Sequence, residues 1–280
     1  MLKRIVSVSL ALVMALGVII LFSTIPGVTL AAGGQDSARA AIAKVSETVD
    51  AAGPIHQKLK ETIADEIASL GTENDSEPDL EESRTGLKEM EGYTEQLKGL
   101  LAGLNGLSDN PETSDGKTVR AAREYLTMLK DMTSDLSELI GYSIDLYEAV
   151  LLMDGMDVEV DGYDELAQQI WDATNATKDR LEQIKPPPYF VISHNDLIIR
   201  VTEFRDFAVD FYTAGELEDP LRIYSCIYRM DRIVRMFDIC SENLDADIDM
   251  ELRQAERRLN GPIALIHEEL TRNLDILKNS

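Results

Sequence analysis

The chain contains three histidines, His56, His194 and His267, and each falls in a different predicted helix. Imidazoles that meet in a helical core can bind zinc or copper. No two of them share a helix face and no Glu-x-x-His step occurs, so the di-iron bundle pattern is absent. His194 occupies a position in an apolar seam, and two interpretations stay open for it. It is either a partly buried histidine bonded to a neighbouring carboxylate, or a metal ligand or pH sensor.

An acidic turn at residues 157–162 reads Asp-Val-Glu-Val-Asp-Gly, with oxygen ligands at alternating positions followed by glycine. This half resembles the start of an EF-hand calcium loop. The second half departs from it, because Asp164 stands where an apolar residue is usual and Gln168 stands in place of the bidentate glutamate. Two interpretations remain, a charged turn before a helix or a weak calcium site. The ligands of that site would be Asp157, Glu159, Asp161 and Asp164.

Rows of opposite charge lie on the two helices predicted at 191–214 and 218–244. If these helices form an antiparallel hairpin, the rows can face one another as solvated ion pairs, each contributing well under about 1 kcal/mol. An anion-binding arginine patch is the alternative. The members are Glu203, Asp206 and Asp210 on the first helix and Arg222, Arg229, Arg232 and Arg235 on the second.

The motifs that commonly carry catalysis are missing from the sequence. There is no Gly-x-Ser-x-Gly and no His-Glu-x-x-His. Residues 115–118, Asp-Gly-Lys-Thr, end like a phosphate-binding loop, but Pro111 stands at the position of its first glycine. We therefore expect no enzymatic activity and no cofactor, apart from weakly bound calcium.

Helical periodicity runs almost without interruption from residue 35, whereas the period-two alternation of strands never persists. The pattern predicts an all-α fold, an elongated antiparallel bundle of about six or seven long helices with coiled-coil-like seams. Gly53-Pro54 and Gly261-Pro262 are expected to kink or interrupt their helices. The seam of the third helix comprises Ala122, Leu126, Leu129, Met132, Leu136 and Leu139. The same spacing predicts a seam on the helix at 218–244, at Ile223, Ile227, Met230, Val234 and Phe237. Helices are expected at 36–70, 79–107, 118–153, 163–185, 191–214, 218–244 and 247–277.

The acidic turn at 154–162 is the best candidate for a boundary. It separates an N-terminal helical subdomain at 35–153 from a C-terminal one at 163–280, and a single bundle over 35–280 is the alternative. A second acidic ladder, from Asp245 to Glu251, is expected to cap the start of the last helix.

The two cysteines, Cys226 and Cys240, lie 14 residues apart in one predicted helix. At ~1.5 Å rise per residue they are roughly 21 Å apart, whereas a disulfide needs Cα atoms within about 7 Å. Because both lie beside the apolar stripe, we expect buried free thiols.

Residues 1–34 have the three parts of an export signal. Lys3 and Arg4 precede an uncharged run from Ile5 to Phe22, and Pro26-Gly27 and small residues follow. A cleaved signal peptide and a retained N-terminal membrane anchor both fit this segment. Either way the basic start predicts an extracytoplasmic body, secreted or anchored to the cell membrane.

The formal net charge of −24 makes nucleic acid and anionic lipid poor partners, so membrane contact is expected only through residues 1–34. We expect a non-enzymatic interaction, sensor-like or structural module, whose partner is another envelope or surface protein. The alternative is an extracytoplasmic protein that binds calcium or a transition metal. Asn74 and Asn175 stand in glycosylation sequons.

Overall fold

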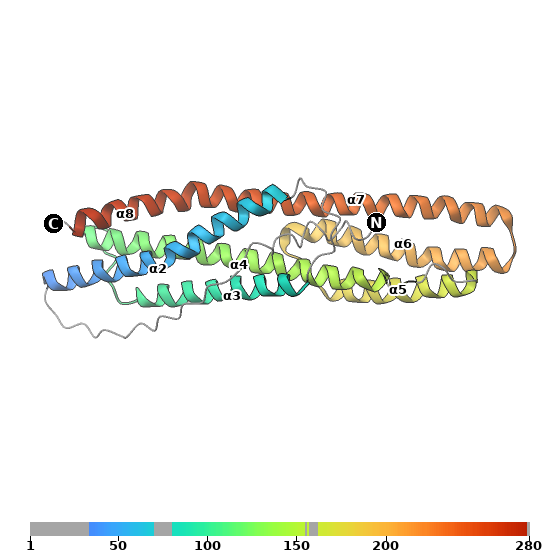
Figure 1. The fold of residues 1–280 in the computed structure, drawn as a ribbon, viewed down its shortest axis with the longest axis horizontal. Helices are drawn as coiled ribbons and strands as arrows, with labels where there is room; N and C mark the ends of the chain where they lie inside the picture. Colours follow the sequence, from blue (N-terminus) through green and yellow to red (C-terminus); the bar gives the residue numbers. More distant parts are fainter. Residues whose placement is uncertain (1–33, 70–79, 155, 157–161, 279–280) are drawn as a thin grey trace. The chain divides into compact units, whose positions relative to one another are not determined.

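The structure, a computed structural model, describes residues 34–69, 80–154, 156 and 162–278. All regular secondary structure in these residues is helical (Figure 1), which confirms the predicted all-α class. No helix in this part of the chain is long and apolar enough to cross a membrane. Residues 1–33 of the predicted leader lie outside the described residues. The helices are α2 Gly34–Ser69, α3 Leu80–Gly103, α4 Ser114–Asp154, α5 Tyr163–Gln183, α6 Val191–Glu216, α7 Pro220–Arg258 and α8 Ala264–Lys278, with a 3₁₀ turn at Pro188–Phe190 and a π-helical turn at Leu259–Ile263.

The chain forms two compact units, and the long helices α4 and α7 each contribute to both. Among the described residues, unit 1 contains 69, 80–84 and 138–251, and unit 2 contains 34–68, 85–137 and 252–278. The boundary predicted at the acidic turn 154–162 stays a prediction, because most of that turn lies outside the described residues.

The core of unit 2 is aliphatic and follows the helical periodicity of its segments. Thr94 of α3 donates a hydrogen bond to Thr133 of α4 at 2.8 Å between the two hydroxyl oxygens, and both threonines are buried. Along α4, every residue of the predicted seam is buried, so that prediction is confirmed. Other buried members of unit 2 are Val45, Leu59, Ile63, Leu97, Leu259, Ile263 and Leu270.

The two Gly-Pro steps interrupt the helices less than the sequence suggests. Helix α2 runs through Pro54. Pro262 lies in the π-helical turn between α7 and α8, where a wider turn tolerates the missing N–H.

The predicted division of the C-terminal region at residues 245–247 is wrong. Helix α7 continues from Pro220 to Arg258, because no glycine or proline interrupts that stretch and the buried Ile248 and Leu252 extend its apolar stripe. The acidic ladder therefore lies inside a helix and caps no helix start. Asp247 instead accepts a hydrogen bond from the hydroxyl of Ser193 on α6.

The side chain of Arg123 in α4 ties the start of the loop between α3 and α4 to that helix. Its guanidinium donates to the carbonyl oxygens of Leu104 and Leu107, at 2.9 and 3.1 Å, and to the carboxylate of Asp109 at 2.7 Å. Leu104 and Leu107 follow the last residue of α3, so these contacts fix the chain that leaves α3 against α4.

Replacing Arg123 with alanine should therefore lower the free energy of unfolding by roughly 1–3 kcal/mol, because hydrogen bonds from a charged donor are lost. Urea denaturation followed by circular dichroism measures this. Arg120→Ala, at an exposed position three residues away, is the matched control and should change stability by less than about 0.5 kcal/mol. Equal stability of the two variants would contradict the role of Arg123.

Candidate functional site: the start of helix α7

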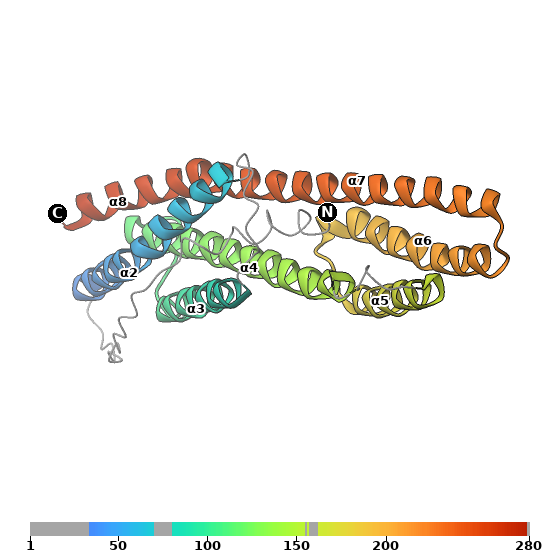
Figure 2. The ribbon, with the colours of Figure 1, turned by 45° about the vertical axis from the view of Figure 1, so that its right-hand side comes forward.

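The turn between α6 and α7 is fixed by local hydrogen bonds. Asp219 caps α7, since one carboxylate oxygen accepts the backbone N–H groups of Leu221 and Arg222 at 3.0 and 3.4 Å. Pro220 opens the helix, where its missing N–H costs nothing. Glu218 adopts a positive φ of 46°, which lets the chain reverse. The result is a hairpin whose two arms, α6 and α7, lie side by side (Figure 2).

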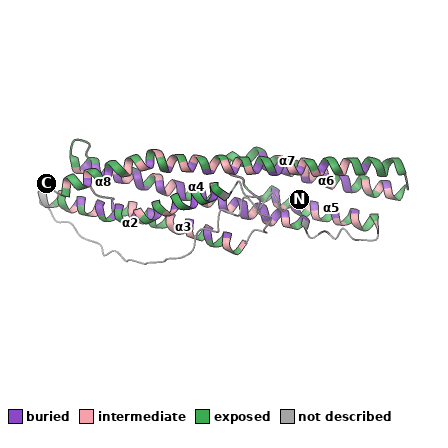
Figure 3. Cartoon of the chain, turned by 45° about the horizontal axis from the view of Figure 1, so that its top comes forward, coloured by how far each residue is buried: buried purple, intermediate pink, exposed green. Residues whose placement is uncertain are grey.

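The first residues of α7 are mostly exposed (Figure 3). Large apolar side chains are among them. Leu221 is 80% exposed and Tyr228 is 77% exposed. Within residues 220–228, which we call the α7 start, only Cys226 is buried. Such a gathering of exposed apolar side chains marks an interaction surface more often than chance. Its members are Leu221, Ile223, Tyr224, Ile227 and Tyr228, with Leu217 beside them in the turn.

Further along the helix, α7 packs on α6 through one stripe. The ring centroids of Phe237 and Phe204 lie 6.2 Å apart, and the thiol of Cys240 donates to a carboxylate oxygen of Asp196 at 2.9 Å. The seam predicted on this helix, at Ile223, Ile227, Met230, Val234 and Phe237, is buried only at its last residue. The stripe that α6 covers lies on a different side of α7 from the predicted seam, and the two share only Phe237. It comprises Cys226, Ile233, Phe237 and Cys240.

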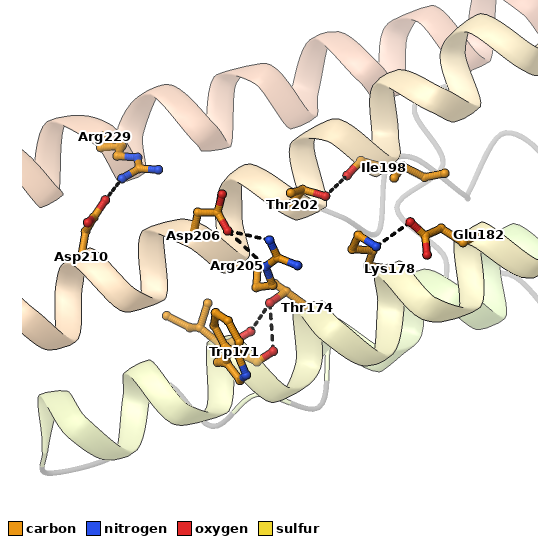
Figure 4. Close-up of polar contacts among 11 residues, drawn as sticks. Trp171, Thr174, Lys178, Glu182, Ile198, Thr202, Arg205, Asp206, Asp210 and Arg229 are labelled. Carbon is orange, nitrogen blue, oxygen red and sulfur yellow. Dashed lines mark hydrogen bonds and ion pairs between the residues drawn. The ribbon is translucent and has the colours of Figure 1, made fainter.

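The charged rows meet only in part. Arg229 of α7 forms an ion pair with Asp210 of α6 (Figure 4). Arg222 instead pairs with Asp219, its own cap, at 3.6 Å, and Arg235 pairs with Asp231 one turn away. On α6, Glu203 and Asp206 pair with Arg200 and Arg205 of the same helix. In the described residues, the predicted facing rows are thus represented by one pair between helices.

A cavity of about 230 Å³ lies between the two arms of the hairpin. Burial and the nearby Asp210 raise the pKa of the Cys226 thiol, and the smaller effect of Arg229 lowers it. Because the net pKa is raised, the thiol stays protonated and unreactive at neutral pH. Arg222 and Arg229 are already paired with carboxylates, so the cavity does not favour an added anion. Its lining consists of Asp210, Thr213, Arg222, Ser225, Cys226 and Arg229.

Behind the hairpin, α5 packs against α6 and supports it (Figure 4). The guanidinium of Arg205 lies 5.5 Å from the ring centroid of Trp171, a cation–π contact. Arg205 also pairs with Asp206 at 2.8 Å. At the end of α6, the hydroxyl of Tyr163 donates to Glu216 at 3.1 Å. These contacts hold the hairpin in place and leave the α7 start exposed.

His194 is buried in unit 1, as expected, but its partner is not a carboxylate. Its Nε2 lies 3.1 Å from the carbonyl oxygen of Leu181, and its Nδ1 lies 3.3 Å from the hydroxyl of Tyr142. Burial lowers the pKa of the imidazole, and the hydrogen bond to Leu181 opposes that shift. With both nitrogens partnered, the predicted metal role has no free ligand atom in this arrangement.

The other two histidines come together in unit 2. The rings of His56 and His267 meet edge to face with centroids 5.4 Å apart, and Tyr125 stacks on His267 at 5.0 Å. The Nδ1 atom of His56 lies 3.0 Å from the Tyr125 hydroxyl, and its buried Nε2 has no partner. No group of three or more His, Cys, Asp or Glu side chains in the described ranges is arranged to hold a metal ion.

The candidate calcium turn is described only at its end. Asp157, Glu159 and Asp161 lie outside the described residues, and Asp164 is exposed in the first turn of α5. The calcium site therefore stays a prediction.

The two cysteines are free and buried, as predicted. The α7 start was not predicted as a site. Its signal in the sequence is a run of leucine, isoleucine and tyrosine too broad for one neighbouring helix to cover. Comparison of the chain with protein-family models, with curated proteins and with solved structures finds no match.

Proposed function

We propose that this chain is a non-enzymatic interaction module, exported or membrane-anchored through its leader, that binds a protein partner through the α7 start. In this proposal its helices form an antiparallel bundle that presents the α6–α7 hairpin at an envelope or cell surface. The observation that carries the proposal is the exposure of Leu221, Tyr224 and Tyr228 on a helix that begins with an ordered cap.

The composition of the surface supports binding to protein. Tyrosine and arginine are enriched in protein interfaces and dominate their binding energy. The α7 start and the next helical turn of α7, residues 229–232, combine Tyr224 and Tyr228 with Arg222, Arg229 and Arg232. Keeping this much apolar surface in water is unfavourable by about 25 cal/mol per Å², and a partner that covers it recovers that free energy.

The buried ionisable groups support a non-catalytic role. Burial and the neighbouring Asp196 raise the pKa of the Cys240 thiol to about 12, so it is no nucleophile at neutral pH. Burial also raises the pKa of Tyr142. Both groups serve as hydrogen-bond donors inside the packed helices.

A capture experiment tests the proposal. The immobilised full-length chain is presented with the solubilised envelope proteins of its source cell, and saturable binding at micromolar concentration is expected. The double variant Leu221→Ser/Tyr228→Ser should weaken this binding at least tenfold without changing the helical circular dichroism, because both side chains are exposed. Failure to find any saturable partner, or equal capture by the variant, would count against the proposal.

A further inference from the structure

The α7 start is uncovered on two sides of one helix. Leu221, Tyr224 and Tyr228 follow one another at steps of three and four and so share one side. Ile223 and Ile227 step by four on another side, and both are exposed. Cys226, the buried residue of this stretch, lies outside the arc that these five residues cover and belongs to the stripe that packs on α6. One neighbouring helix therefore covers only part of the apolar surface that this stretch carries.

Near the turn, the two arms of the hairpin carry opposite formal charge. Residues 220–237 of α7 contain four arginines and Asp231, a formal charge of +3. Residues 203–219, the end of α6 and the turn, contain six carboxylates and Arg205, a formal charge of −5. The chain has a net charge of −24, so residues 220–237 are an unusually basic segment, and they lie beside the acidic residues 203–219.

We propose that two copies of this chain associate through the α6–α7 hairpin, with the α7 start of each copy against the end of α6 of the other about a two-fold axis. This rests on the proposed function and names its partner as a second copy. A two-fold interface must be self-complementary, and a hairpin with one basic and one acidic arm meets that condition. The exposed Val209 and Tyr212 near the end of α6 supply apolar surface opposite the α7 start.

Other partners fit the hairpin less well. An anionic bilayer would attract the arginines but repel Glu216, Glu218 and Asp219, which lie at the turn itself. A foreign acidic protein would complement α7 and leave the carboxylates of α6 facing like charge. A second copy offers both signs, and away from this hairpin the acidic surfaces of two copies repel each other, which confines association to it.

Sedimentation equilibrium of the full-length chain from 1 to 100 µM tests the proposal. The wild type should dimerise in this range, and Leu221→Asp/Tyr228→Asp should weaken dimerisation at least tenfold. Leu265→Asp, at a 66% exposed position of α8 in unit 2, is the matched control and should dimerise like the wild type. A wild type that is monomeric at 100 µM, or a dimer that the double variant leaves unchanged, would overturn the proposal.

A charge-reversal experiment distinguishes this specific pairing from non-specific hydrophobic association. Arg232→Glu/Arg235→Glu places like charge against α6 of a second copy, and Asp206→Lys/Glu218→Lys places like charge against α7. Each double variant should dimerise at least fivefold more weakly. An equimolar mixture should recover affinity, because in the mixed dimer the introduced glutamates on α7 of one copy face the introduced lysines on α6 of the other, and the second contact keeps its wild-type residues. No recovery in the mixture overturns the two-fold pairing.

Two parallel measurements separate this proposal from the one on which it rests. A monomeric wild type that still captures a saturable envelope protein through Leu221 and Tyr228 refutes the second copy and keeps the interaction module. A monomer that captures nothing refutes both. Sedimentation of the monomer with phosphatidylglycerol vesicles would overturn the second copy in favour of a lipid surface.

Discussion

Replacing Asp245 with asparagine should stabilise the protein at pH 8, by up to about 4 kcal/mol. The Oδ1 atom of Asp245 is inaccessible to solvent and has no hydrogen-bond partner. Burial, with the nearby Glu242 adding to it, raises the pKa of this carboxyl from 3.8 to about 7. Because the folded-state pKa is raised, the folded form holds the proton more tightly than the unfolded form. The contribution of the protonated Asp245 carboxyl to the free energy of unfolding is therefore fully present below pH 3.8. It is lost as the pH rises through about 7.

Urea denaturation at pH 8 and at pH 4 measures this effect. Asp245→Asn should be more stable than the wild type at pH 8, and the difference should shrink strongly at pH 4, where the wild-type carboxyl is protonated. Asp179→Asn, at an exposed carboxylate of α5, is the control and should change stability by less than about 0.5 kcal/mol. A destabilised Asp245→Asn variant at pH 8 would show that the carboxylate has a compensating partner.

Unit 2 should lose stability in acid through His56. Burial, with smaller electrostatic contributions from His267 and Lys60, lowers the pKa of this imidazole from 6.5 to about 4. The depressed pKa means that the unfolded chain takes up the proton first as the pH falls. The contribution of uncharged His56 to the free energy of unfolding is fully present above pH 6.5. It is lost on acidification through pH 4 and amounts to roughly 3 kcal/mol in all.

Stability measured from pH 7.5 to pH 4 for the wild type and for His56→Gln isolates this contribution. The variant should lose about 2–3 kcal/mol less over that range, since it has no group to protonate there. In NMR titrations the His56 ring of the wild type should titrate well below pH 6, and in His267→Gln its midpoint should rise, because one of the opposing charges is gone. Equal pH dependence of the wild type and His56→Gln would contradict the buried, uncharged state of His56.

Much of the fold follows from sequence because helices record their buried sides in the spacing of apolar residues. The seam of α4 is predicted residue by residue, since α4 is buried along a continuous stripe. The free, buried state of Cys226 and Cys240 follows from helix geometry alone. The continuity of α7 was missed because Asp245 and Asp247 resemble a helix cap, while the stronger signal was the absence of any breaker nearby.

The candidate site was less accessible to sequence, for a physical reason. Spacing shows that Ile223 and Ile227 share a side of α7, but it does not show whether another helix of the same chain covers that side. Only the packing reveals that α6 covers the stripe through Cys226 and Phe237 and leaves those isoleucines exposed. The partners of His194 were beyond reach for the same reason, because Tyr142 and Leu181 lie far from it in sequence.

Site-specific photocrosslinking in the source cell tests the central claim most directly. Tyr228→p-benzoylphenylalanine places a crosslinker on the exposed α7 start, and Leu265→p-benzoylphenylalanine places one on an exposed part of α8. If the proposed assignment of the α7 start as the contact surface holds, illumination should give a discrete higher-mass adduct from position 228 and none from position 265. Absence of an adduct at 228, or the same adducts from both positions, would contradict the assignment of the α7 start as the interaction surface.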